Sequence, residues 1–169
     1  MATTIEELSG ILTRGEIKHA FDKDGDIYFG FQTENYTNSA GDKSLGIYLR
    51  ISNEGQMFSL TAHDGFVVKG SKHIEAFLKL CSILQMTGYL IQFEYVPSNG
   101  TVRPCIEIPL IDNKLTKGQL DFCIASMVKV MEDNYSSLKQ ALETGSLAGL
   151  PEDMLEAMKD EASDDTTTL

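Results

Sequence analysis

The sequence has only three arginines, no tryptophan and no run of the roughly 18 apolar residues that a membrane-spanning helix needs. Arg14, Arg50 and Arg103 lie far apart, and the formal net charge is −11 at pH 7. Nucleic acids and anionic membrane surfaces would repel such a chain unless it gathered its basic residues in one groove. We therefore expect no nucleic acid and no membrane as a partner, and a basic or neutral protein as the partner if there is one.

Cysteine is also scarce. The three cysteines, Cys81, Cys105 and Cys123, each lie within an apolar pattern, and an odd number at long spacings does not suit a disulfide framework. We expect reduced thiols buried in the core. The first ten residues lack the basic and apolar regions of a secretory signal. Together these features predict a cytoplasmic protein.

Motifs that carry chemistry are missing as well. The histidines His19, His63 and His73 have neither the helical spacing nor the Cys-x-x-Cys partner that zinc sites use. The acidic turn at residues 22–26 is a poor calcium loop, because its sixth position is not glycine and its twelfth is not glutamate. We predict no catalytic residues, no metal and no cofactor, and hence that the protein is not an enzyme.

Apolar periodicity and capping residues predict two helices before residue 90. Thr4 and Glu7 have the spacing of a capping box, and Gly15 marks the end of the helix that they begin. A second helix is predicted from a cap at Ser71 to a stop at Gly88.

The clearest structural signal is the run from Ile106 to Leu142, which predicts a strand, a polar turn and a long helix. Thr116 and Gln119 repeat the capping-box spacing, and Gly145 ends the helix. Its apolar stripe steps by three and four residues and can cover a sheet face. The stripe consists of Leu120, Ile124, Met127, Met131, Tyr135, Leu138 and Leu142.

Three apolar residues of this helix, Phe122, Val128 and Val130, lie off the stripe. Off-stripe apolar residues indicate a second contact surface, such as a dimer partner. We predict that these three form a protein interface.

Alternating apolar and polar residues predict five strands, three before the second helix and two after it. They lie at residues 27–32, 47–52, 57–62, 89–96 and 102–110. Residues 17–21 continue the first helix or become extended, and Phe66–Val68 resumes the third strand after a bulge or forms a short separate strand. Pro104 cannot donate to a ladder, so its strand is at an edge or carries a bulge.

The short connections favour antiparallel pairing, and the alternation favours a sheet covered mostly on one side. The predicted fold class is therefore α+β, in the order helix, three strands, helix, two strands, helix.

The run from Ile106 to Asn113, the Leu115–Leu120 helix start and Tyr135 resemble the end of YbjN-like bacterial domains. Those domains pair an E-[LI]-x-L-x-[DN] strand with an L-T-x-x-Q-L helix start. The order of elements over residues 4–145 also resembles that family and, through it, the fold of type III secretion chaperones. The resemblance implies a small, acidic, commonly dimeric domain that binds other proteins without catalysis, and it carries no catalytic residues over.

Residues 146–169 fall outside this resemblance. Seven acids face one base there, and residues 151–162 could make a short amphipathic helix. We predict a domain at residues 4–145 followed by an acidic tail at 146–169. The leading functional hypothesis is a chaperone-like or regulatory adaptor that binds another protein as a homodimer. The alternatives are a small-molecule binder or weak enzyme with an unrecognised pocket, and a tail that itself docks a basic partner.

Overall fold

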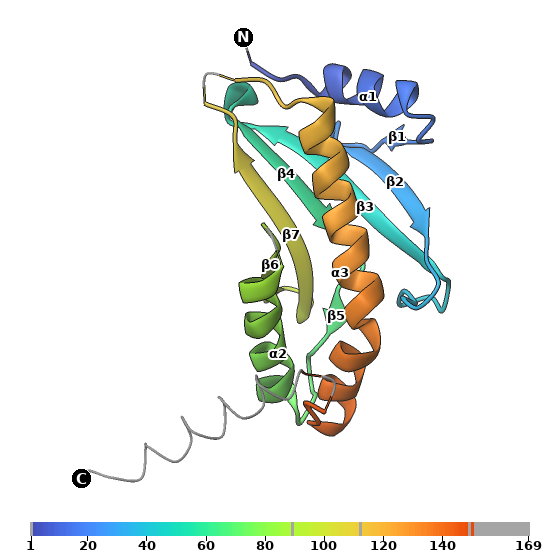
Figure 1. Cartoon of the computed structure of the whole chain (residues 1–169), viewed down its shortest axis with the longest axis vertical. Coiled ribbons are helices and arrows are strands. Elements are labelled where there is room, and N and C mark those ends of the chain that lie inside the picture. Colours follow the sequence, from blue (N-terminus) through green and yellow to red (C-terminus); the bar gives the residue numbers. More distant parts are fainter. Residues whose placement is uncertain (1, 89, 112, 149, 151–169) are drawn as a thin grey trace, which may run out of the picture.

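The central feature of the structure, a computed structural model, is a curved antiparallel sheet (Figure 1). The model describes residues 2–88, 90–111, 113–148 and 150. In these residues the sheet order is β1-β2-β3-β4-β7-β5, and β6 pairs with β7. The strands are β1 (Ala20–Phe21), β2 (Ile27–Gln32), β3 (Ser44–Ser52), β4 (Met57–Ala62), β5 (Phe66–Val67), β6 (Gln92–Val96) and β7 (Thr101–Pro109). The predicted α+β class is confirmed.

Three α-helices complete the described residues: α1 (Ile5–Arg14), α2 (Ile74–Thr87) and α3 (Lys117–Thr144). A single 3-10 turn, η1 (Asn53–Gly55), joins β3 to β4. Helix α3 runs diagonally across one face of the sheet, α2 packs beside its C-terminal half, and α1 lies at the opposite end (Figure 1). No helix in this part of the chain is long and apolar enough to cross a membrane.

Both predicted capping boxes are present. The Thr4 hydroxyl accepts the amide N–H of Glu7, whose carboxylate accepts the amide N–H of Thr4. Thr116 and Gln119 do the same at the start of α3. Gly145 ends α3 in the left-handed conformation that glycine adopts without strain (φ 75°). These helix ends are therefore encoded by residues next to them in sequence.

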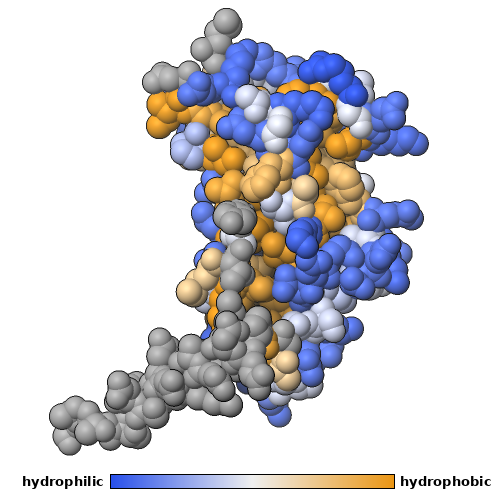
Figure 2. All heavy atoms as spheres, viewed as in Figure 1, coloured by the Kyte–Doolittle hydropathy of each residue, from blue (hydrophilic) through white to orange (hydrophobic). Residues whose placement is uncertain are grey.

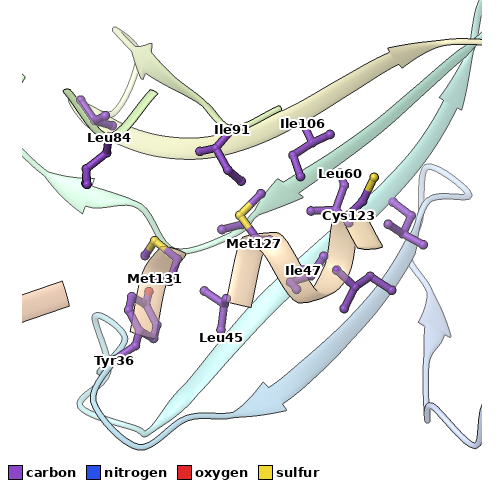
Figure 3. Close-up of a cluster of buried hydrophobic side chains, with 14 of the residues drawn as sticks. Tyr36, Leu45, Ile47, Leu60, Leu84, Ile91, Ile106, Cys123, Met127 and Met131 are labelled. Atoms are coloured by element: carbon purple, nitrogen blue, oxygen red, sulfur yellow. The ribbon is translucent and has the colours of Figure 1, made fainter. Parts of the chain in front are cut away.

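The core lies between α3 and the sheet (Figure 3). Met127 and Met131 are fully buried against inward-facing strand residues such as Leu60 and Ile106. Most of the predicted stripe of α3 is buried, whereas its members Tyr135 and Leu142 are only partly so. The helix therefore covers the sheet as its periodicity predicts.

The predicted cap of α2 is wrong. His73 occupies the N-cap position, and no side chain caps the helix there. The Ser71 hydroxyl instead accepts the amide N–H of His73 and donates to the carbonyl of Leu142 at 2.9 Å. Ser71 thus ties the start of α2 to the end of α3, a long-range role that local sequence does not reveal.

Of the two alternatives predicted for the Pro104 strand, an edge position or a bulge, the edge position is wrong. Strand β7 pairs with β6 on one side and with β4 and β5 on the other. The pairing with β4 stops at Cys105 and the pairing with β5 starts at Val102, so Pro104 lies opposite the break at residues 63–65. An interior strand accommodates proline here because its neighbour is interrupted where the missing N–H would be needed.

Two strands begin at other residues than the pattern predicts, and two segments follow one of their predicted alternatives. Strand β3 begins at Ser44, three residues before its predicted start, and β6 begins at Gln92, three residues after its predicted start. Residues 20–21 form the short strand β1, which agrees with the extended alternative for that segment. Phe66 and Val67 form a separate strand, as one of the two predicted alternatives has it. The predicted helix at 151–162 lies outside the described residues, and the division of the chain at residue 145 stays a prediction.

A surface loop is held on α3 by a single carboxylate. Glu132 accepts the backbone N–H groups of Glu34, Asn35 and Tyr36 at N–O distances of 2.9 to 3.2 Å. The Tyr36 ring is buried and packs edge-on against Tyr135, with ring centroids 5.2 Å apart. This arrangement links segments about a hundred residues apart in the chain.

The three cysteines are free and buried, as predicted. Burial raises the pKa of Cys81 and of Cys105 to about 12, and it also raises the pKa of Cys123. A thiol with a raised pKa holds less thiolate at a given pH, and the thiolate is the reactive form.

We therefore expect a disulfide reagent such as DTNB at pH 8 to react with the three thiols far more slowly in the native protein than in urea. The stability that the protonated Cys81 and Cys105 contribute is complete below the unfolded pKa of about 8.5. It is lost as the pH rises through the folded value of about 12. Rapid native labelling at pH 8 would contradict the burial.

Candidate protein-binding surface

The helical face of the sheet is only partly covered. Five adjacent strands at a spacing of about 4.8 Å form a surface roughly 20 Å wide, whereas a helix is about 10–12 Å across. Helix α2 packs beside the C-terminal half of α3, and α1 lies near its start on the β2 side; among the described residues, no helix flanks the N-terminal half of α3 on the β7 side (Figure 1). Hydrophobic residues therefore appear on both sides of α3 on this face (Figure 2).

An apolar depression lies between the start of α3 and β7, and we call it the β7 groove. It has a volume of about 580 Å³. Phe122 forms one wall with half of its surface exposed, and Leu90 is exposed to the same extent. The lining residues are Leu90, Glu107, Ile108, Pro109, Thr116, Gly118, Gln119, Phe122 and Cys123. The groove is shallow and open, with an apolar floor and polar groups at its rim.

A second apolar depression, the β2 groove, lies on the other flank of α3 and has a volume of about 440 Å³. Val128 and Ala125 of the helix face Phe31 of β2 and Ile17 of the segment after α1. Lys129 stands at its edge. This flank could accept an apolar side chain between two elements that are already packed against the core.

Val130 lies in a third, smaller depression of about 260 Å³ between α3 and α2. Leu84 and Gly88 of α2 line its opposite side. Lys129 and Asp133, which form an ion pair with each other, contribute a charged edge. The surroundings of Val130 are therefore more polar than those of Phe122.

The structure thus separates the three residues that the sequence grouped together. Phe122, Val128 and Val130 line three different depressions around one helix. Helical geometry explains the separation. At about 100° per residue, Val128 is rotated by about 120° from Phe122, whereas Val130 is rotated by only about 80° but lies roughly 12 Å further along the helix. Leu90 was missed, since it lies in a segment that the pattern assigned to a strand.

The opposite face of the sheet carries a depression of a different kind, which we call the polar hollow. Its volume is about 280 Å³. It is lined by Asp22, Asp26, Tyr48, Arg50, Ser59, Thr61, His63, Glu94, Arg103 and Glu107. Sequence reasoning placed these residues on the solvent side of separate strands and turns, and nothing in their spacing indicated that they meet. Only the strand order and register bring them together.

Two solved structures share this fold. One chain of the ExsC–ExsE complex aligns with a TM-score of 0.52 and 14% identity, over 85% of this chain and 99% of that chain. YbjN from E. coli aligns with a TM-score of 0.54 and 8% identity, over 80% of this chain and 94% of that chain. No protein-family model and no curated protein matches the sequence. The predicted YbjN-like, type III secretion chaperone-like fold is confirmed.

Proposed function

We propose that this domain binds another protein without catalysis, in a chaperone-like or regulatory role, and that it acts as a homodimer in the cytoplasm. The observation that carries the proposal is the half-exposed Phe122 at the wall of the open β7 groove. The fold adds support, because one chain with this fold is known in a complex, ExsC–ExsE. The other, YbjN, is described as a candidate transcription regulator.

The energetics favour the β7 groove as the main contact. Covering the exposed half of a phenylalanine removes about 100 Å² of apolar surface from water, which stabilises a complex by about 2 kcal/mol. That free energy corresponds to roughly a 30-fold change in affinity. Val128 and Val130 offer smaller side chains, so they act as secondary contacts in the other two depressions beside α3.

Two observations make binding a better proposal than an enzyme or a small-molecule site. The raised pKa values of the buried cysteines oppose a nucleophilic role for these thiols. The grooves beside α3 are shallow, whereas a small-molecule site encloses most of its ligand. An open apolar groove suits a segment of another protein.

The homodimer is tested by light scattering coupled to size exclusion. We expect a mass of twice 18.7 kDa for the native chain and a shift toward 18.7 kDa for Phe122→Asp. Gln140→Asp adds the same charge at an exposed position near the other end of the same helix, and it should leave the mass unchanged. A mass of 18.7 kDa for the native chain at every concentration would remove the homodimer.

Binding of a different protein is tested separately with a photo-crosslinking amino acid. Benzoylphenylalanine at position 122 should give a discrete adduct in the source cells, whereas the same residue at position 140 should not. Matching patterns of adducts from both positions would contradict a specific role for the β7 groove.

A further inference from the structure

The polar hollow has the shape of a trough because of its strand register. Ser59 on the central strand β4 lies between Arg50 on β3 and Glu107 on β7. Thr61, two residues further along β4, pairs with Tyr48. Small side chains therefore line the floor, and longer side chains from the flanking strands form the walls.

One wall is aromatic. Tyr48 and His63 line the hollow, with their ring centroids 5.0 Å apart, and the ring of Tyr28, which is not part of the lining, packs against Tyr48 at 4.8 Å. Gly46 makes room for them, because a Cβ there would lie 3.0 Å from the Tyr28 hydroxyl and 3.1 Å from its ring. Tyr28 is nevertheless 39% exposed. The ring cluster is thus partly open to solvent, on a face of the sheet that none of the helices in the described residues covers (Figure 1).

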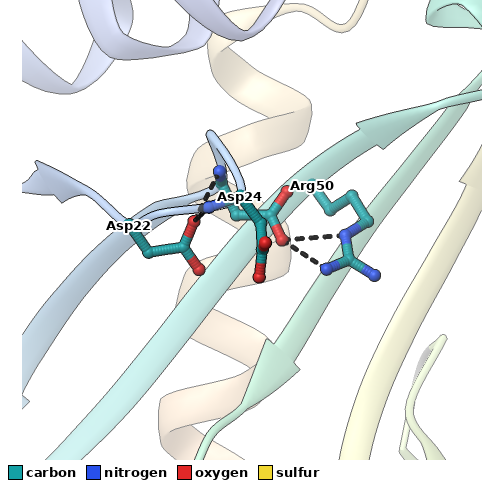
Figure 4. A network of polar contacts seen from close by, with 4 residues as sticks. Asp22, Asp24 and Arg50 are labelled. Atoms are coloured by element: carbon teal, nitrogen blue, oxygen red, sulfur yellow. Dashed lines mark hydrogen bonds and ion pairs between the residues drawn. The ribbon is translucent and has the colours of Figure 1, made fainter.

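The two arginines of the hollow are already paired. Arg50 donates through Nε and Nη2 to one carboxylate oxygen of Asp26, at 2.8 and 2.5 Å (Figure 4). Arg103 donates through the same two nitrogens to Glu94 at 3.3 Å. In these two pairs, each positive charge is offset by a carboxylate. The remaining acids of the lining, Asp22 and Glu107, therefore make the net charge of the hollow negative.

The groups that remain are acceptors and rings. Within the described residues, the Glu107 carboxylate accepts one side-chain hydrogen bond, from the Ser59 hydroxyl at 3.3 Å. In the same residues, the Tyr48 hydroxyl and the His63 ring make no hydrogen bond. The pKa of Tyr48 is raised, first by desolvation and then by negative neighbours that include Asp22. The local potential is therefore negative.

We propose that the polar hollow binds an arginine side chain of a partner protein, between the Tyr28–Tyr48–His63 cluster and the Glu107 carboxylate. A planar guanidinium stacks on an aromatic face and donates two parallel N–H groups to a carboxylate. This inference rests on the proposed protein-binding function and names a second contact, on the face opposite the β7 groove.

An arginine fits better than an anion for two reasons. Arg50 and Arg103 each already face a carboxylate, which offsets much of the positive charge that an anion would need. The chain as a whole carries a charge of −11, which attracts cations toward the trough and repels anions. A lysine would match the charge but lacks the planar fork and stacks less well.

The probe for this site is a short blocked peptide, acetyl-Gly-Arg-Gly-amide, titrated into the full chain and followed by NMR. We expect saturable shifts that are centred on Tyr28, Tyr48 and His63. The same peptide with citrulline, which keeps the shape and removes the charge, should give no saturable shift. Equal shifts with citrulline, or shifts spread over the whole acidic surface, would overturn the proposal.

Variants locate the contact. Glu107→Gln and Tyr48→Leu should each weaken binding of the arginine peptide by about fivefold or more, whereas Tyr48→Phe keeps the ring and most of the affinity. Thermal melts of the variants establish that the fold is kept.

Phe122→Asp on the other face should bind the peptide normally. Glu107 lines both depressions, so the pair that tells failure of the β7 groove from failure of the hollow is Phe122→Asp and Tyr48→Leu, each of which changes only one of them. Unchanged affinity in Tyr48→Leu would exclude the aromatic wall.

Discussion

Met127→Ala is expected to lower the free energy of unfolding by about 3 kcal/mol, within the range of 2–5 kcal/mol for removing a large buried side chain. Met127 is fully buried at the centre of the contact between α3 and the sheet, near Leu60 and Ile106 (Figure 3). The smaller side chain leaves a cavity, because strand residues fixed in a ladder cannot move in to fill it. Urea unfolding followed by circular dichroism measures the change.

Two further variants show whether the loss comes from the cavity. Met127→Leu keeps the volume and should cost less than about 1.5 kcal/mol. Lys129→Ala, two residues along the same helix, removes only the exposed ion pair with Asp133 and should cost at most about 0.5 kcal/mol. If Met127→Ala cost no more than Lys129→Ala, α3 would not be packed on the sheet as described.

Features that depend on neighbouring residues were predictable from the sequence. The capping boxes at Thr4 and Thr116 and the stop at Gly145 each involve residues within one helical turn. The burial of Met127 and Met131 follows from the period of the stripe and the hydrophobic effect. The α+β class follows from these elements and their short connections.

Features that depend on strand order were not predictable. Pro104 lies inside the sheet because the break after β4 happens to fall opposite it, and the sequence does not state which strands are neighbours. The polar hollow needs the pairing of β4 with both β3 and β7 before Ser59 can lie between Arg50 and Glu107.

For the predicted interface residues, the sequence identified the residues but not their surroundings. The helical period identified Phe122, Val128 and Val130 as outside the buried stripe, and all three line depressions on the surface. It could not show which flank of α3 the other elements leave uncovered. That depends on where α2 ends relative to α3, which is a property of the packed structure.

Glu132→Ala should lower the free energy of unfolding by about 2 kcal/mol. A hydrogen bond to a charged group contributes about 1.5–3 kcal/mol. Glu132 accepts the N–H groups of three successive residues, but the site is half-buried, so we take a value at the lower end. Urea unfolding gives the total loss. Hydrogen exchange at residues 34–36 gives the local loss, and these amides should exchange much faster in the variant.

Glu132→Gln provides the matched comparison, because its amide oxygen still accepts hydrogen bonds but lacks the charge. It should retain part of the protection, whereas Glu132→Ala should retain little. Tyr36 remains anchored in both variants through its ring contact with Tyr135 and its hydroxyl, which donates to the Asp64 carbonyl at 2.7 Å. The loop should therefore loosen at Glu34 and Asn35 first. Unchanged exchange at these two amides would mean that the carboxylate does not hold the loop, and that packing of Tyr36 alone positions it.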